Sequence, residues 1–206
     1  MEMETDEFWT IIETARAATD KPFDEALTDV LAGLPLERIL DYDERFHAVH
    51  ESVYRWDVWA ASYLIGGWFS DDGFIDFRAG LISLGREWFE RVAAAPDSLA
   101  DHPLVDSSGS VDDLEEALLQ EDATYAVLGA YDRVTGVQDS YYDAQEARAA
   151  SRPKREDVEP DMGEKWDFED DGEMRRRLPR LAALCLDKDD DDEDDEEGDD
   201  EEGDED

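Results

Sequence analysis

The sequence predicts an all-α protein: a compact multi-helix domain with a disordered acidic C-terminal tail. Apolar residues recur every three or four positions through the first two-thirds of the chain, which is the spacing of one helical face. No segment shows the convincing apolar–polar alternation of a half-buried strand. We divide the chain into a helical domain over 5–150, a linker and docking segment with a short C-terminal helix over 151–186, and a tail over 187–206.

The first two predicted helices each carry a short apolar stripe. In the first, the stripe falls at i, i+3, i+4 and i+7, at Phe8, Ile11, Ile12 and Ala15. The second follows Pro22, a residue suited to the first position of a helix. Its stripe comprises Leu27, Val30, Leu31 and Leu34.

A long helix is predicted after Pro35 and ends at the Gly66-Gly67 pair. Its three- or four-residue step runs through Ile39, Tyr42, Phe46, Val49, Val53, Trp56, Ala60 and Tyr63. The stretch from Trp56 to Ile65 is apolar on most sides, so we expect it to be the most buried part of the fold.

Two further helices complete the predicted domain. Ser70 is a favourable N-cap, with Asp71 and Asp72 in the first turn, and the helix should end near Ala95. Its stripe comprises Phe74, Phe77, Leu81, Leu84 and Trp88. Ser110 caps a second helix that Gly136 closes. Its stripe comprises Leu114, Leu118, Tyr125, Leu128 and Tyr131.

The signal weakens after Tyr142. Residues 151–165 are rich in charge and proline, which indicates a linker or a surface segment. Trp166 and Phe168 are candidates to dock back onto the domain. A short final helix, interrupted or started by Pro179, is indicated by Met174, Leu178, Leu181, Leu184 and Leu186.

The charge balance is strongly acidic. The chain has 60 acidic and 19 basic residues; residues 187–206 hold 17 of the acids and one lysine, so the first 186 keep 43 and 18. The tail has no apolar residue to bury and should be disordered. The acidic body should repel nucleic acid and anionic membranes, so we expect neither as a direct partner. Such acidity fits a basic protein partner, adaptation to high salt, or solubility by self-repulsion.

Cysteine content and hydropathy indicate in which cellular compartment the protein is expected. With Cys185 as the single cysteine, the chain cannot form an internal disulfide or a multi-cysteine metal site. The acidic residues 1–6 do not resemble a signal peptide. The longest apolar candidate, Val58 to Phe69, is too short to cross a bilayer. We therefore expect a cytoplasmic protein.

A set of short motifs resembles one uncharacterised bacterial family. The central block is Tyr54-Arg55-Trp56-Asp57-Val58-Trp59-Ala60-Ala61, followed by Ser70-Asp71-Asp72-Gly73-Phe74 and Phe77-Arg78. The same pattern includes Glu7-Phe8-Trp9 with Ile11-Ile12, and Leu81-Ile82 with Gly85-Arg86-Glu87. These resemble the domain of unknown function 4240 over roughly Thr5 to Gly136, and more loosely from Trp166 to Leu181. The resemblance implies no known activity.

Asp71 and Asp72 are the first candidates for chemistry, since paired carboxylates can bind Mg²⁺ or act as acid and base. Adjacent helical residues diverge by about 100°, however, and helix capping explains both.

Asp57 lies in the most apolar segment and should find a cationic partner, for which Arg78 is our prediction. This pair would either tie two helices together or, with Arg86, form an anion pocket.

His47 and His50 stand at i, i+3, a spacing that can hold a metal on a helix. A third ligand is not evident, so we predict no metal site and no cofactor. Nothing orders the serine and histidine residues into a catalytic triad. We therefore favour a protein that is not an enzyme.

The remaining candidates concern partners. Trp68 and Phe69 should be exposed and are candidates for a partner surface. Arg175-Arg176-Arg177 and Arg180 form a basic patch over which the acidic tail can fold.

Our leading hypothesis is a non-catalytic binding or regulatory protein that engages a basic partner through its acidic surface and tail. The alternatives are a DNA-mimicking decoy, or an enzyme or ligand-binding protein using the Asp57, Asp71, Asp72, Arg78 and Arg86 cluster. The oligomeric state is not predicted.

Overall fold

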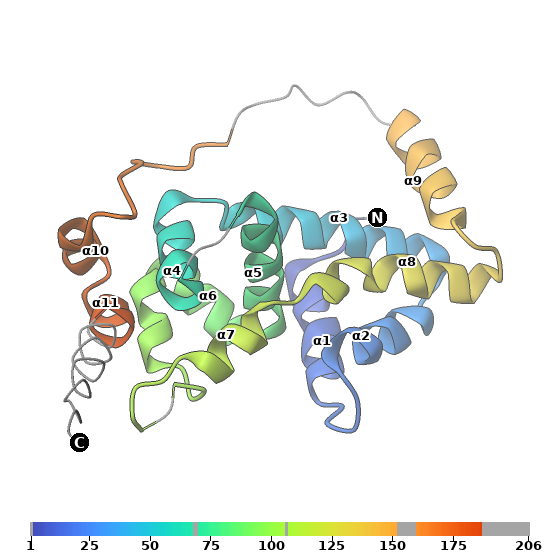
Figure 1. Cartoon of the computed structure of the whole chain (residues 1–206). Coiled ribbons are helices and arrows are strands. Elements are labelled where there is room, and N and C mark those ends of the chain that lie inside the picture. Colours follow the sequence, from blue (N-terminus) through green and yellow to red (C-terminus); the bar gives the residue numbers. More distant parts are fainter. Residues whose placement is uncertain (1, 68–69, 106, 152–159, 187–206) are drawn as a thin grey trace, which may run out of the picture.

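The structure is a computed structural model that describes residues 2–67, 70–105, 107–151 and 160–186. Within these ranges it is all-helical, as predicted, and contains no strand (Figure 1). The elements are α1 Thr5–Arg16, α2 Phe23–Ala32, α3 Leu36–Ser52, α4 Trp56–Gly66, α5 Asp71–Ser83, α6 Arg86–Ala94, the 3₁₀ helix η1 Pro96–Asp101, α7 Asp112–Leu118, α8 Glu121–Thr135, α9 Ser140–Ala150, α10 Asp171–Arg177 and α11 Pro179–Cys185.

The helices form two groups joined by α3 and α5. At one end α8 packs on α2, and α2 packs on α1; at the other end α4, α6, α7, η1 and α11 pack together (Figure 1). One apolar core runs through both groups. Its fully buried large side chains include Phe8, Ile12, Leu27, Leu31, Ile39, Tyr42, Phe74, Phe77, Leu81 and Leu99.

The first two helices lie where the apolar spacing predicts them. Phe8, Ile11, Ile12 and Ala15 are all buried on α1, and Leu27 and Leu31 are buried on α2. Pro22 and Pro35 act as N-cap residues in extended conformation, one position before the first helical residue. A proline there costs no hydrogen bond, because the first amides of a helix have no intrahelical partner.

Each of the three longer helices predicted from the sequence is in fact two helices. The predicted helix ending at Gly66 is broken between Ser52 and Trp56, where the Trp56 amide donates to the Met162 carbonyl at 3.0 Å. The helix predicted from Ser70 to Ala95 ends at Ser83. Gly85 there has φ +89°, a conformation that side-chain-bearing residues rarely adopt.

The third break, at Leu119 and Gln120, separates α7 from α8. Across the first two breaks the apolar stripe keeps a three- or four-residue spacing, from Val53 to Trp56 and from Leu84 to Trp88. Across the third it steps by seven residues, two helical turns, from Leu118 to Tyr125, which is 54% exposed and not in the core. Spacing alone therefore could not reveal where each helix ends.

Beyond α8 the structure departs from the weak sequence signal. Gly136 closes α8 in the left-handed conformation, as predicted, but α9 then forms a helix that the sequence did not indicate. Residues 160–186, which we call the C-terminal strap, pack on the group that contains α4, α6, α7 and η1. Phe168 packs its ring on Trp56 and Tyr63, with centroids 6.1 and 5.8 Å apart, and Met174 and Leu181 are fully buried.

Two expectations fall outside the described residues: the disorder of the tail 187–206 and the exposure of Trp68 and Phe69. In the part of the chain that the structure describes, no helix has both the length and the apolar character needed to span a bilayer.

Candidate functional site

The predicted Asp57–Arg78 ion pair is absent. Asp57 instead pairs with Arg55, whose Nε and Nη2 each donate to one carboxylate oxygen at 2.9 Å. The Asp57 side chain is 42% exposed, so the expectation that it is buried is wrong. It lies in the first turn of α4, at a side of the helix that the core does not reach.

Arg78 is the buried member of the predicted cluster, with a side chain 4% exposed. Its Nη1 donates to Glu51 Oε1 and to the His50 carbonyl, both at 3.3 Å, and so links α5 to α3. The guanidinium also lies over the rings of Tyr54 and Phe74, 4.6 and 4.9 Å from their centroids. Burial lowers the pKa of Arg78, an effect that Glu51 opposes.

Arg86 lies apart from Arg78, on the outer side of α6. It donates to Asp6 at 2.7 Å and to Glu90 at 2.6 Å. It contributes to an open depression of about 560 Å³, lined by Glu13, Arg16, Leu84, Arg86, Glu87, Trp88 and Glu90. Of the five cluster residues, this depression includes Arg86 and none of the other four, so they do not form the anion pocket that the sequence suggested.

The two histidines of the predicted i, i+3 pair have different partners and do not point to a common site. His47 Nε2 lies 3.4 Å from Asp43 Oδ1 on the surface of α3, whereas His50 is buried and its Nε2 donates to the Ile75 carbonyl at 3.0 Å. Burial lowers the pKa of His50 to about 4. Among the described residues no group of three histidine, cysteine, aspartate or glutamate side chains is arranged to bind a metal ion.

Asp71 and Asp72 have the local role that the sequence predicts and belong to a larger feature. Ser70 Oγ accepts from the Gly73 amide at 3.2 Å, which confirms it as the N-cap of α5. Further carboxylates lie on α5, on α7 and at the start of α8, three helices that pack together around the contact of Gly80 with Leu118. We call this set the acidic face: Asp71, Asp72, Asp76, Asp112, Asp113, Glu115, Glu116, Glu121 and Asp122.

The acidic face is not neutralised by the described part of the chain. None of its carboxylates lies within 4.0 Å of a described lysine or arginine. Burial, and then the charges of Glu121 and Asp72, raise the pKa of Asp76. Burial and Asp112 likewise raise the pKa of Glu115. Both groups therefore lie in a negative potential, which disfavours their own ionisation.

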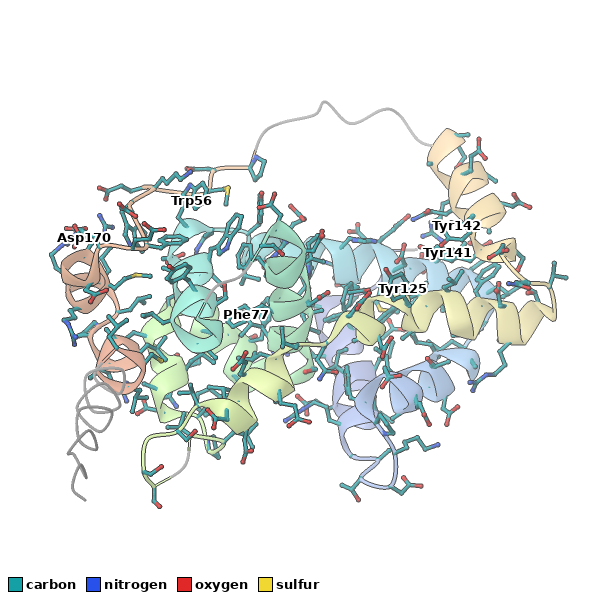
Figure 2. All side chains as sticks on the ribbon, viewed as in Figure 1. Trp56, Phe77, Tyr125, Tyr141, Tyr142 and Asp170 are labelled. Atoms are coloured by element: carbon teal, nitrogen blue, oxygen red, sulfur yellow. The ribbon has the colours of Figure 1, made fainter. Side chains whose placement is uncertain are left out.

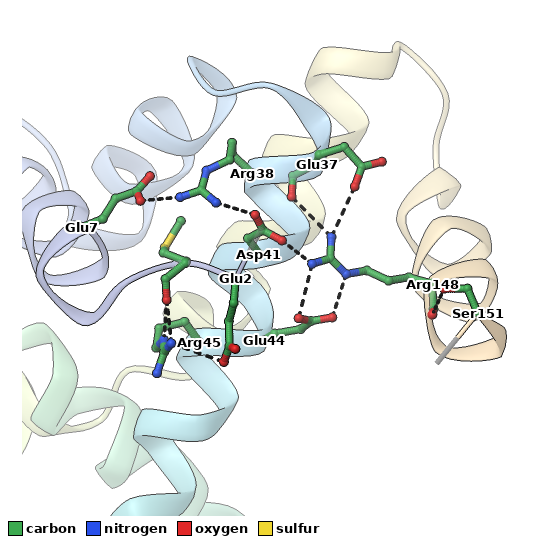
Figure 3. A network of polar contacts seen from close by, with 10 residues as sticks. Glu2, Glu7, Glu37, Arg38, Asp41, Glu44, Arg45, Arg148 and Ser151 are labelled. Atoms are coloured by element: carbon green, nitrogen blue, oxygen red, sulfur yellow. Dashed lines mark hydrogen bonds and ion pairs between the residues drawn. The ribbon is translucent and has the colours of Figure 1, made fainter. Parts of the chain in front are cut away.

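The described cations lie elsewhere, against other carboxylates. Those that pair with a carboxylate within 4.0 Å are Arg16, Lys21, Arg38, Arg45, Arg55, Arg78, Arg86, Arg91, Arg133, Arg148, Arg176, Arg177 and Arg180. In the largest network, shown in Figure 3, Arg148 of α9 pairs with Asp41, Glu37 and Glu44 of α3, and Arg38 bridges Asp41 to Glu7. Sequence reasoning missed Arg148, because more than one hundred residues separate it from these acids.

Exposed apolar side chains accompany the acidic face. Ile75, Leu119 and Tyr125 are 41%, 42% and 54% exposed. Ile75 lies between Asp72 and Asp76 on α5, and Tyr125 lies one turn after Glu121 on α8. Tyr125 lies in the second turn of α8 (Figure 2).

The packing of α5 brings these residues into one region. Gly80 of α5 lies against the backbone of Leu118, the last residue of α7. Asp76 is one turn earlier on the same side of α5, and the carboxylate of Glu121 acts on its pKa. The part of α5 from Asp76 to Gly80 therefore flanks the α7–α8 junction, which carries Leu119. The runs of acids over 112–122 were the sequence signal that could have indicated this face.

Comparison with known proteins supports a family assignment. A family model described as a protein of unknown function (DUF4240) matches residues 3–133, which include the whole acidic face. The search of curated proteins and the search of solved structures each return no significant match. The resemblance seen in the sequence is thus confirmed, and the chain belongs to the DUF4240 family of proteins of unknown function.

Proposed function

We propose that this protein is a non-catalytic binding or regulatory protein that engages a basic partner protein through its acidic surface, with the acidic tail adding to the attraction. The observation that carries the proposal is the distribution of charge. Described arginines pair with carboxylates of their own chain, while no described lysine or arginine lies within 4.0 Å of a carboxylate of the acidic face.

A basic partner would relieve this surplus. Cationic side chains placed near Asp76 and Glu121 would lower the free energy of carboxylates that repel one another in the free protein. Charge of one sign over a face also accelerates association with a partner of opposite sign, and salt screens that effect. The 17 acids of residues 187–206 would extend the same attraction over a larger radius.

The experiment is an affinity capture from native cell lysate, with captured proteins identified by mass spectrometry. It compares the full chain with a chain that ends at Leu186, each at low salt and at about 150 mM salt, where the Debye length is about 8 Å. We expect the full chain to retain a specific basic protein, with retention falling as salt rises and falling further on truncation.

A matched pair of variants assigns the contact to the folded body. Glu121→Gln with Asp122→Asn removes two charges from the acidic face, and Glu146→Gln with Asp143→Asn removes two from α9. We expect the first pair to weaken capture and the second to leave it nearly unchanged. Retention of no specific protein, or retention that salt does not affect, would contradict the proposal. A captured DNA-binding protein that DNA displaces would identify the DNA-mimic version.

A further inference from the structure

We propose that the α5–α8 part of the acidic face, with Ile75, Leu119 and Tyr125, docks a basic partner segment that also presents apolar side chains. This inference rests on the proposed function and adds the position and chemistry of the contact. A basic segment without apolar residues would use only the charges, whereas this site would also bury the three exposed side chains.

The first argument is the coincidence of the two features. Single exposed apolar side chains are common on protein surfaces and indicate little. Here Leu119 lies at the junction of α7 with α8, Tyr125 lies one turn after Glu121, and Ile75 lies next to Asp76, whose pKa the charge of Glu121 raises. An apolar centre within a polar rim is the usual arrangement of a protein interface, and tyrosine is enriched at such centres.

The second argument comes from a comparison within the molecule. Another set of exposed apolar side chains, Val134, Val137 and Tyr142, lies where α8 meets α9, and Tyr142 is 52% exposed. The helices around Tyr142 carry Arg133 and Arg148, both paired with acids of other helices. The second set thus has described arginines beside it, whereas the α5–α8 acids have no described lysine or arginine within 4.0 Å.

The third argument is rigidity. Tyr125 and Ile75 stand on helices rather than on loops, and Gly80 holds α5 directly against the α7–α8 junction. A surface held in this way loses little conformational freedom when a partner binds, so more of the contact energy appears as affinity. The chemistry of the occupant follows from charge complementarity: lysine or arginine opposite the carboxylates, with leucine-like side chains between them.

The test uses two defined probes with the full-length chain. One is a fluorescent amphipathic peptide of lysine and leucine; the other has the same lysines with serine in place of leucine. Binding is measured by anisotropy at about 150 mM salt, where exposed charges more than a Debye length apart are largely screened. We expect the leucine peptide to bind at least about tenfold more tightly, a difference of about 1.4 kcal/mol.

Matched variants locate the site. Tyr125→Ser with Ile75→Ser should reduce the affinity for the leucine peptide about tenfold, which corresponds to about 1.4 kcal/mol, and leave the serine peptide unaffected. Tyr142→Ser with Val137→Ser, which removes side chains of similar exposure at α9, should change neither affinity. Circular dichroism and thermal unfolding show that each variant remains folded.

The outcomes separate this inference from the proposed function. Equal affinity for the two peptides, or equal loss in the two double variants, would overturn the docking site while leaving a general attraction for basic proteins. Binding of neither peptide would contradict both. A loss specific to Tyr125 and Ile75, with the serine peptide unaffected, would support the site.

Discussion

Gly80 of α5 meets the backbone of Leu118, the last residue of α7, so closely that a side chain has no room. A Cβ on Gly80 would lie 2.5 Å from both the carbonyl carbon and the Cα of Leu118. Cβ atoms do not approach backbone so closely, and backbone cannot move aside as the end of a long side chain can. The close approach fixes the α7–α8 junction, and with it Leu119 and the start of the acidic face.

Gly80→Ala should therefore destabilise the protein by about 2–3 kcal/mol, because the added methyl forces α5 and α7 apart. Gly129→Ala is the matched control on α8, where a Cβ would meet Thr28 Cγ2 at an ordinary 3.5 Å. That control should stabilise the protein by about 0.5–1 kcal/mol through helix propensity. Urea unfolding measures both; equal effects would show that the Gly80 contact is looser than the structure has it.

Arg148→Gln should loosen α9. The substitution leaves buried Asp41 with Arg38 as its remaining cation and should cost about 1–3 kcal/mol. Arg133→Gln is the control: its pair with Asp29 is exposed and should contribute less than about 1 kcal/mol. Hydrogen exchange should increase in α9 of the Arg148 variant and not in the control. An α9 that stays protected would mean that Tyr141, whose hydroxyl donates to Asp43 at 2.8 Å, suffices to hold it.

His50 should make the protein less stable in mild acid. Its pKa is about 4 in the folded chain and 6.5 as the ordinary value, so the unfolded chain binds the extra proton first. Above pH 6.5 His50 is neutral in both states and does not lower the free energy of unfolding. As the pH falls from 6.5 toward 4, the protonation of His50 in the unfolded chain lowers that free energy by at most about 3 kcal/mol.

The variant His50→Gln keeps an amide donor for the Ile75 carbonyl and removes the titration. The loss of stability between pH 6.5 and 4 should be smaller in this variant than in the wild type, since all the carboxylates are common to both. Parallel stability curves for the two proteins across that range would contradict the assignment.

Asp76→Asn should stabilise the protein at neutral pH. The folded pKa of Asp76 is raised, so its ionised form is disfavoured in the folded state, and stability is lost as pH rises through the folded pKa. The gain should be about 0.5 kcal/mol at pH 7, because the site is partly screened by water, and should vanish at a pH low enough to protonate the aspartate in both states. Glu146→Gln, on the exposed side of α9, should have a smaller effect. Thermal unfolding at pH 3 and pH 7 makes the comparison.

The C-terminal strap should stay bound when its covalent connection is cut. A protease site inserted within 152–159 and cleaved in the folded protein would leave the strap attached through buried Met174 and Leu181 and through Asp97, which accepts from the Leu181 amide at 3.0 Å. Size-exclusion chromatography should show co-elution of the two fragments. Leu181→Asp should separate them, and Arg176→Ala, an exposed change, should not. Separation without any substitution would mean that the strap depends on its connection.

The candidate site was predicted in part. Ser70, Asp71 and Asp72 were recognised as a cap and first turn, since capping depends on neighbours in the sequence. The predicted partner of Asp57 was wrong, because Arg55, two residues away, could satisfy it without any contact between helices. The acidic face required α5, α7 and α8 to be placed together, and no local rule gives that placement.

The sequence by itself determined the helical class, the apolar stripes of α1 and α2, the helix ends at Gly66 and Gly136, and the family. These follow from spacing, capping and short motifs, which depend on residues close together in the chain. The tertiary structure alone decided where the three long stripes break, how α9 is held against α3, and which carboxylates have no described lysine or arginine beside them. Contacts such as Gly80 with Leu118 and Arg148 with Asp41 join residues far apart in the chain, and their free energy depends on packing and solvent exclusion that exist only in the folded molecule.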